Sequence, residues 1–122
     1  MEYRKMEKLN VNTSLLGFGC MRFPTLENGE INEKEAEKMI DEAIKNGVNY
    51  IDTAYPYHNG ASEPFVGRVL EKYPRESYYL ATKLPMWKVE KREDVTEIFA
   101  LFFFNLNAFY WMYCFNFYQE HS

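Results

Sequence analysis

Cysteine is scarce in this chain of 122 residues, and its basic residues do not outnumber its acidic ones. Its two cysteines, Cys20 and Cys114, lie far apart in unlike contexts, so a disulfide framework is unsupported and a reducing, cytoplasmic compartment is expected. The net charge of −4 argues against nucleic acid as a partner, and no basic amphipathic run suggests binding to an anionic membrane. Residues 1–8 contain no apolar core, which argues against a signal peptide.

Length is also limited. A chain of 122 residues can form one modest domain. A closed (β/α)8 barrel needs about 200 residues or more, so these residues alone cannot form a complete barrel of that kind.

Charge disappears abruptly towards the C-terminus. Residues 1–99 contain 14 basic and 17 acidic residues, an ordinary soluble mixture, whereas residues 100–118 contain none. Of the 19 residues in that run, 16 are hydrophobic and 10 are aromatic, without a visible helical or strand period. We therefore divide the chain into a structured part, residues 1–99, and an atypical hydrophobic tail, residues 100–122.

The first 99 residues alternate between strand-like and helix-like segments. A short hairpin is expected at 3–5 and 11–16, strands at 15–18, 48–51 and 78–82, and helices after Asn32, from Ser62 and from Lys91. The βαβαβα order predicts a parallel sheet with right-handed crossovers, which fits either a barrel or a doubly wound sheet.

The two complete helix patterns have clear ends. In the first, Asn32 and Glu35 predict a capping box, and Gly47 is placed to end the helix in a left-handed conformation. Its expected apolar stripe consists of Ala36, Met39, Ile40, Ala43 and Ile44. In the second, Ser62 is the expected cap. Its expected buried face consists of Val66, Val69, Leu70 and Tyr73.

Three polar residues lie at or just past the ends of successive strands. Asp52 and Lys83 each end an apolar strand-like run, and Tyr57 follows Asp52 by five residues. A phenol has an ordinary pKa of about 10, but a nearby ammonium favours the phenolate and a carboxylate can hold that ammonium in place. Such a group suits protonation of a carbonyl oxygen while hydride arrives at the carbon. The placement also favours a barrel, whose active sites lie at the carboxyl ends of the strands.

Three ordered motifs carry a resemblance to a known family. They are Gly-Phe-Gly-Cys-Met-Arg at 17–22, Ile-Asp-Thr-Ala-Tyr-Pro-Tyr at 51–57 and Ala-Thr-Lys at 81–83. Up to about Phe99, the chain resembles the first third of an aldo-keto reductase, a family of (β/α)8 barrels. The expected fold is therefore α/β, the βαβαβα portion of an incomplete TIM-type barrel. The resemblance implies an oxidoreductase that reduces aldehydes or ketones, with NADP(H), or alternatively NAD(H), as its cofactor.

The resemblance also assigns site residues. The family uses an Asp, Tyr, Lys and His tetrad, of which Asp52, Tyr57 and Lys83 carry over. Tyr57 would donate the proton, Lys83 would favour the phenolate, and Asp52 would orient Lys83. Cofactor contacts are implied at Gly19, Cys20, Met21 and Asp52. The partner would be a small carbonyl substrate, and no metal is expected.

Other residues near the motifs have two interpretations each. Cys20 suits a nucleophile, but no base accompanies it in the sequence, so a small buried residue is favoured. His58 suggests a general base, although a solvated loop histidine is the preferred account. Trp87 either lines the substrate pocket or covers the barrel rim.

The tail has three possible origins. A transmembrane helix of about 20 residues would fit its length, but its three asparagines and the absence of basic residues on its C-terminal side argue against it. Degraded family sequence would make His121 the fourth tetrad residue. A frameshift or gene truncation fits the abrupt loss of charge and periodicity, and we favour it. The chain is then an inactive reductase fragment, or alternatively a non-catalytic protein that self-associates or contacts a membrane through its tail.

Overall fold

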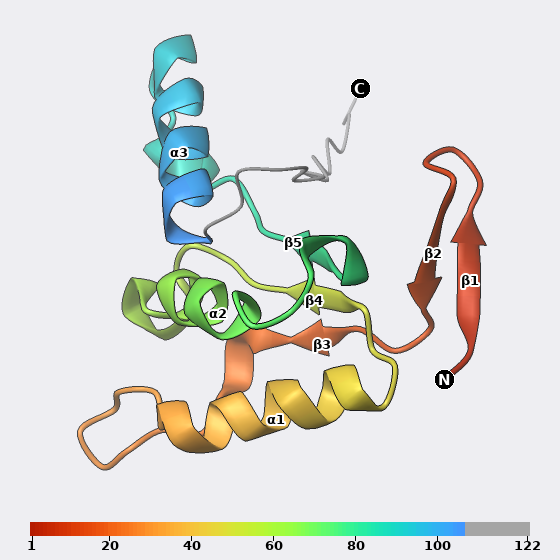
Figure 1. Ribbon diagram of the computed structural model, residues 1–122. Helices are drawn as coiled ribbons and strands as arrows, with labels where there is room; N and C mark the ends of the chain where they lie inside the picture. The colour runs from red at the N-terminus through yellow and green to blue at the C-terminus, as the bar shows by residue number, and fades with distance from the viewer. Residues whose placement is uncertain (107–122) are drawn as a thin grey trace.

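Three short parallel strands form the centre of the structure, a computed structural model that describes residues 1–106 (Figure 1). Their order in the sheet is β3 (Phe18–Gly19), β4 (Tyr50–Asp52) and β5 (Tyr79–Ala81), and both neighbouring pairs are parallel. The register aligns the last residues of the three strands with one another. Their carboxyl ends therefore lie side by side.

Helices alternate with these strands, as the sequence pattern predicts. α1 (Glu33–Lys45) connects β3 to β4, α2 (Ser62–Leu70) connects β4 to β5, and α3 (Arg92–Asn105) follows β5. Short 3-10 turns complete the connections: η1 (Cys20–Arg22), η2 (Tyr57–Gly60), η3 (Arg75–Ser77) and η4 (Met86–Lys88). The α/β class is confirmed, and the described part forms an incomplete rather than a closed barrel.

The expected hairpin is present and lies away from the carboxyl ends of the strands. β1 (Tyr3–Met6) and β2 (Val11–Ser14) pair antiparallel. The Tyr3 hydroxyl donates to the backbone oxygen of Gly47 at 2.9 Å, and the last amide of β2 donates to Oδ1 of Asn49 at 2.7 Å. Because Gly47 and Asn49 precede β4, the hairpin lies beside the amino-terminal side of the sheet (Figure 1).

Both ends of α1 follow from local sequence. The Asn32 side chain accepts a hydrogen bond from the Glu35 amide at 3.3 Å, but the Glu35 carboxylate accepts from Lys38 Nζ at 2.8 Å, so only half of the expected capping box forms. Gly47 follows the helix with a φ of +90°, the predicted left-handed conformation. A Cβ at Gly47 would lie 2.7 Å from the Tyr3 hydroxyl oxygen, so a larger residue would also displace the Tyr3 side chain.

The core lies between the sheet and the helices. Ala36 and Ile40 of α1 are fully buried, whereas Met39 is exposed, so the predicted stripe is wrong at that position. The buried cluster consists of Cys20, Phe23, Ile31, Ala36, Ile40, Val48, Ile51, Phe65, Val66, Val69, Leu70, Tyr78, Leu80 and Leu106. This cluster includes residues of β4, β5, α1 and α2 and of the segments that connect them.

Two local predictions are wrong. Leu15 and Leu16 are exposed, and the sheet begins only at Phe18, because the Leu15 amide still bonds to Glu2 beside the hairpin at 2.9 Å. Ser62 does not cap α2. It is the first helical residue, and its hydroxyl is buried against the sheet instead of bonding the helix's own amides.

α3 continues across the change in composition near residue 99. The helix runs to Asn105, and Phe102 and Leu106 are both buried. Within residues 1–106, no helix is both long enough and apolar enough to cross a membrane. Residues 107–122, which include Cys114 and His121, lie outside the described residues, so the expectations for most of the tail stay predictions.

We expect Ile40→Ala to lower the free energy of unfolding by about 2–5 kcal/mol, because it removes a fully buried side chain and leaves a cavity. Met39→Ala on the same helix is the matched control and should change the unfolding free energy by only about 0.5 kcal/mol. Urea unfolding followed by circular dichroism measures both. Equal effects of the two substitutions would contradict the assignment of the buried face of α1.

Candidate active site

Asp52 and Lys83 meet at the carboxyl ends of β4 and β5. Lys83 Nζ donates hydrogen bonds to both carboxylate oxygens of Asp52, at 2.7 and 2.9 Å, and to the backbone oxygen of Thr53 at 3.1 Å. Asp52 and Lys83 are 31 positions apart in the chain, and the parallel register brings them together. The expected placement of the acid and the amine at one end of adjacent strands is therefore confirmed.

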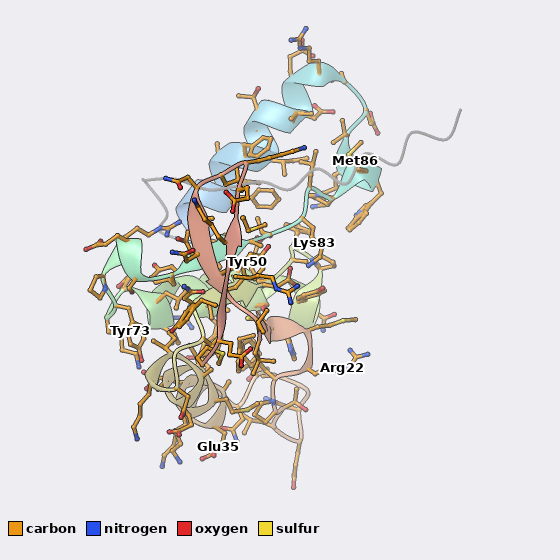
Figure 2. All side chains as sticks on the ribbon, turned by 90° about the vertical axis from the view of Figure 1, so that its right-hand side faces the viewer. Arg22, Glu35, Tyr50, Tyr73, Lys83 and Met86 are labelled. Atoms are coloured by element: carbon orange, nitrogen blue, oxygen red, sulfur yellow. The ribbon has the colours of Figure 1, made fainter. Side chains whose placement is uncertain are left out.

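The pair lies on the face of the sheet opposite to the helices. Ile51 is fully buried in the core, and side chains alternate along a strand, so Asp52 projects from the other face. The Asp52 and Lys83 side chains are 37% and 52% exposed. In Figure 2, Lys83 lies on the other side of the molecule from Tyr73, whose hydroxyl donates to Asp41 of α1. The pair is therefore accessible from outside.

Tyr57 begins the η2 turn beside Lys83. Lys83 Nζ lies 5.1 Å from the centroid of the Tyr57 ring. Partial burial works to lower the pKa of Lys83, but hydrogen bonds with Asp52 and then Tyr57, and the charges of both groups, raise that pKa above its ordinary value. Lys83 is thus held as an ammonium between a carboxylate and a phenol.

Two left-handed residues shape the turn that carries Tyr57. His58 has φ 52° and ψ 45°, and Asn59 has φ 55° and ψ 35°. The Ala61 amide closes the turn on the His58 oxygen at 3.0 Å. Such backbone conformations cost non-glycine residues about 1–3 kcal/mol each, so surrounding contacts must hold this turn in place.

His58 provides one of those contacts. The sequence favoured a solvated loop histidine at this position, but the side chain bonds another segment. Its Nε2 accepts a hydrogen bond from the Phe23 amide at 3.2 Å, and the two rings lie 5.6 Å apart. His58 therefore ties the loop after β4 to the segment after β3, and its Nε2 is engaged in this contact.

The residues expected near the cofactor end β3 and begin η1. A Cβ added at Gly19 would meet no atom within 4 Å, so open space adjoins its backbone. Met21 is exposed and Cys20 is fully buried. Burial, reinforced by the charge of Asp52 and opposed by that of Lys83, raises the pKa of the Cys20 thiol to about 12. Cys20 is the buried thiol that the sequence favoured, and a nucleophilic role does not fit.

Sequence reasoning missed two groups of residues around the pair. One is a buried polar cluster behind it, which consists of Thr53, Ser62, Glu63 and Thr82. The other is the pair of Tyr55 and Lys88, in which Lys88 Nζ donates to the Tyr55 hydroxyl at 2.5 Å. A polar Ser62-Glu63 step before an apolar helix face was the available signal for the first group. Trp87, next to Lys88, is exposed, so both expected roles for it stay open.

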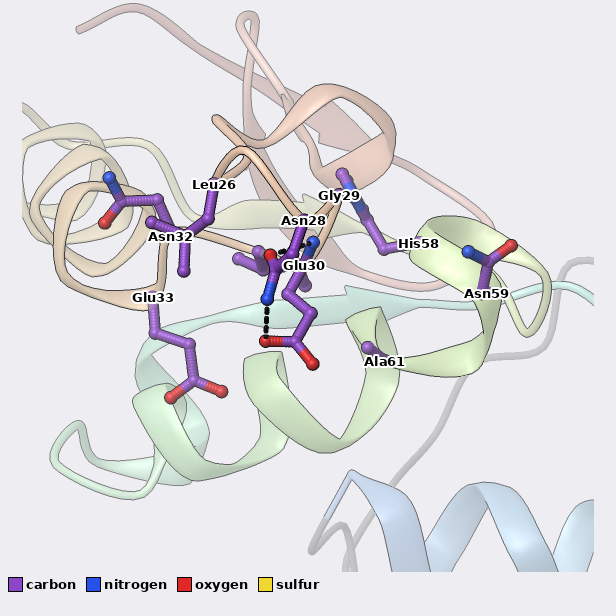
Figure 3. A pocket seen from close by; sticks show the side chains of 10 residues that line it. Leu26, Asn28, Gly29, Glu30, Asn32, Glu33, His58, Asn59 and Ala61 are labelled. Atoms are coloured by element: carbon purple, nitrogen blue, oxygen red, sulfur yellow. Dashed lines mark hydrogen bonds between the residues drawn. The ribbon is translucent and has the colours of Figure 1, made fainter.

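A groove lies beside the Tyr57 turn and does not include Asp52 or Lys83. Figure 3 shows it between the loop before α1 and the η2 turn. Its volume is about 710 Å³. It is lined by Leu26, Asn28, Gly29, Glu30, Ile31, Asn32, Glu33, His58, Asn59 and Ala61. Within residues 1–106, no group of three or more His, Cys, Asp or Glu residues is arranged to hold a metal ion.

The arrangement of carboxylate, ammonium and phenol can support proton donation. A fixed positive charge stabilises the negative charge that a phenol acquires when it gives up its proton. A carboxylate bonded through both oxygens keeps the ammonium charged and oriented. This chemistry suits an acceptor whose oxygen becomes basic during reaction, such as a carbonyl oxygen that is being reduced.

Comparison with known families identifies a matching pattern. The sequence pattern described as the aldo/keto reductase family matches residues 15–106, seven residues beyond the boundary at 99 that the composition suggested. The chain is 35% identical to a probable aldo-keto reductase 1 of Glycine max over 79 residues, which are 65% of this chain and 23% of that protein. It is 33% identical to aldo-keto reductase YhdN of Bacillus subtilis over 90 residues, 72% of this chain and 27% of that protein.

Solved structures of aldo-keto reductases have a similar fold. The holo form of aldo-keto reductase AKR11C1 from Bacillus halodurans is 29% identical, with a TM-score of 0.68 over 88% of this chain and 37% of that one. An aldo-keto reductase from Klebsiella pneumoniae in complex with NADPH, 18% identical, shares the fold, with a TM-score of 0.70 over 88% of this chain and 36% of that one. The chain spans about a quarter of the length of these curated relatives.

We expect Cys20 to resist alkylation in the folded chain. Because the thiol is buried and its pKa is about 12, iodoacetamide at pH 8 should modify it about 10²-fold or more slowly than after unfolding in guanidinium. Mass spectrometry of the peptide that contains Cys20 measures the rate separately from that of Cys114. Fast modification under native conditions would show that the thiol is exposed or activated.

Proposed function

Because the chain belongs to the aldo/keto reductase family, we propose that it supplies the acid–base residues of an NAD(P)H-dependent oxidoreductase that reduces aldehydes or ketones. The observation that carries this proposal is the position of Lys83 Nζ. It bonds both oxygens of Asp52, at 2.7 and 2.9 Å, and lies 5.1 Å from the centroid of the Tyr57 ring.

Each residue has a separate role in the proposed reaction. Tyr57 gives its hydroxyl proton to the carbonyl oxygen of the substrate. Lys83 stabilises the negative charge left on the Tyr57 oxygen, and Asp52 holds Lys83 charged and in position. The ion pair is partly exposed, so it contributes little to the stability of the fold, and its main effect is to orient Lys83.

The residues around the pair fit a nicotinamide cofactor. Open space adjoins Gly19, Met21 is exposed beside it, and the Asp52 carboxylate offers an acceptor for a carboxamide donor. When bound, the cofactor, NADP(H) or alternatively NAD(H), supplies the hydride. We assign its contacts to Gly19, Cys20, Met21 and Asp52, with Cys20 contributing through its backbone because its side chain is buried.

Turnover also needs parts that residues 1–106 do not contain. Three parallel strands cannot enclose a substrate as the eight strands of a barrel do. The fourth tetrad residue has one candidate, His121, which lies outside the described residues. We therefore expect no reductase turnover from the 122-residue polypeptide when it is tested alone.

A second candidate function is association with other polypeptide chains. Within residues 1–106, β3 and β5 each pair on one side only, which leaves two strand edges unpaired. Exposed apolar side chains on nearby turns add to this surface: Leu15, Leu16, Met21, Met86 and Trp87.

A chimera tests the proposed reaction. We expect a protein in which residues 15–106 replace the matching segment of the Bacillus subtilis YhdN relative to reduce an aromatic aldehyde with NADPH. Tyr57→Phe should lower kcat by about 10²–10⁴-fold, because only the proton donor is lost, and NADPH binding should change little. Tyr55→Phe, in the same loop, is the matched control and should retain most activity. A folded chimera without turnover, or a Tyr57→Phe variant that keeps it, would contradict the proposal.

Sedimentation velocity tests the second candidate. We expect the 122-residue polypeptide to form oligomers whose proportion rises with concentration, because the strand edges and apolar side chains are unpaired. Replacing Trp87 with serine should shift the distribution towards the monomer. A stable monomer at all concentrations would rule out this function.

A further inference from the structure

Four polar side chains are buried directly behind the Asp52–Lys83 pair. They form two hydrogen-bonded pairs: Thr53 Oγ1 lies 2.9 Å from Ser62 Oγ, and Thr82 Oγ1 donates to Glu63 Oε1 at 2.5 Å. Their exposed fractions lie between 0% and 4%. Buried polar groups add less to stability than apolar side chains of the same size would, so their placement calls for another explanation.

Thr53 is held from three directions at the end of β4. It directly follows Asp52, and its amide donates to the Ala81 oxygen at 2.8 Å. Its backbone oxygen accepts from Lys83 Nζ at 3.1 Å, and its hydroxyl bonds that of Ser62. Any movement of Thr53 would therefore move both the carboxylate beside it and the acceptor for the ammonium.

Thr82 occupies the corresponding place after β5. It directly precedes Lys83, and its hydroxyl bonds the carboxylate of Glu63, which is only 1% exposed. Glu63 follows Ser62 in the first turn of α2. The first turn of α2 thus bonds Thr53, which follows the acid at the end of β4, and Thr82, which precedes the amine just past the end of β5.

The Asp52–Lys83 ion pair cannot fix the positions of its two side chains by itself. Its two side chains are 37% and 52% exposed, and ion pairs of that kind contribute little because water competes for both charges. The separation of carboxylate and ammonium therefore depends on how firmly the strand ends beneath them are held. The buried cluster is the element that joins the two ends.

We propose that Ser62 and Glu63 are positioning residues, which hold Thr53 and Thr82 and thereby set the distance between the Asp52 carboxylate and the Lys83 ammonium. The importance of this positioning for catalysis rests on the proposed function of the Asp52–Lys83 pair. The geometry itself does not require turnover, so it can be measured in the 122-residue chain.

Trace labelling of lysine amines in the full chain tests the proposal. Acetic anhydride reacts with the neutral amine, so a lysine held in its charged form labels slowly, and mass spectrometry resolves each site at low protein concentration. Lys34 is exposed and serves as the internal reference. Lys83 should label more slowly than Lys34, and Asp52→Asn should mark the full effect of losing the counter-charge.

We expect Ser62→Ala and Thr82→Val each to raise the labelling of Lys83 relative to Lys34 by about threefold or more, because the ammonium loses its fixed partner. Glu63→Gln keeps an acceptor oxygen for Thr82 and should stay close to wild type. Ser77→Ala removes another serine hydroxyl, one that bonds Pro74 on the surface at 2.6 Å, and should leave the ratio unchanged.

Two results would overturn the proposal. One is an unchanged Lys83 ratio in folded Ser62→Ala and Thr82→Val proteins whose melting temperatures fall, which would make the cluster purely structural. The other is a rise of the Lys83 labelling ratio in Ser77→Ala that equals the rise in Ser62→Ala and Thr82→Val. If Thr82→Val fails to fold, the labelling ratio of Ser62→Ala alone tests the proposal, because this variant keeps the Thr82–Glu63 hydrogen bond. An inactive chimera with the expected labelling response would refute the proposed function alone.

Discussion

The parallel register between β4 and β5 is the constraint on which the candidate site depends. Asp52 and Lys83 are 31 residues apart, and they meet because Ile51 pairs opposite Leu80. A slip of one residue would turn Asp52 towards the helices, where its carboxylate would lose water without gaining Lys83. The apolar core therefore protects the geometry of the polar pair, since Ile51 fits only on the face that the helices cover.

Helix α2 both packs against the sheet and places polar side chains behind the Asp52–Lys83 pair. Its apolar side chains, such as Val66 and Val69, pack it against the sheet, while its first turn is polar and buried. The helix-covered face of the sheet thus contains the packing, and Asp52 and Lys83 on the opposite face remain partly exposed. The hairpin bonds the other end of β4 through Gly47 and Asn49, so it stabilises the unit without approaching the pair.

The change in composition near residue 99 does not coincide with the end of a helix. The charge pattern changes near residue 99, yet α3 continues to Asn105, and Leu106 packs into the core. The pattern of the aldo/keto reductase family also matches up to residue 106. The physical reason is that a helix needs buried contacts on one face only, and Phe102 of α3 and Leu106 just past its end supply them.

By itself, the sequence determined the alternation of strands and helices, the Asn32 cap, the left-handed Gly47 and the placement of Asp52 and Lys83 at strand ends. These depend on short-range periodicity and on backbone preferences of single residues. Only the tertiary structure decided that His58 bonds Phe23, that Ser62 faces Thr53 instead of capping its helix, and that Leu15 and Leu16 stay exposed. Each of these outcomes depends on a neighbour that folding brings from elsewhere in the chain, and no local pattern specifies which neighbour that is.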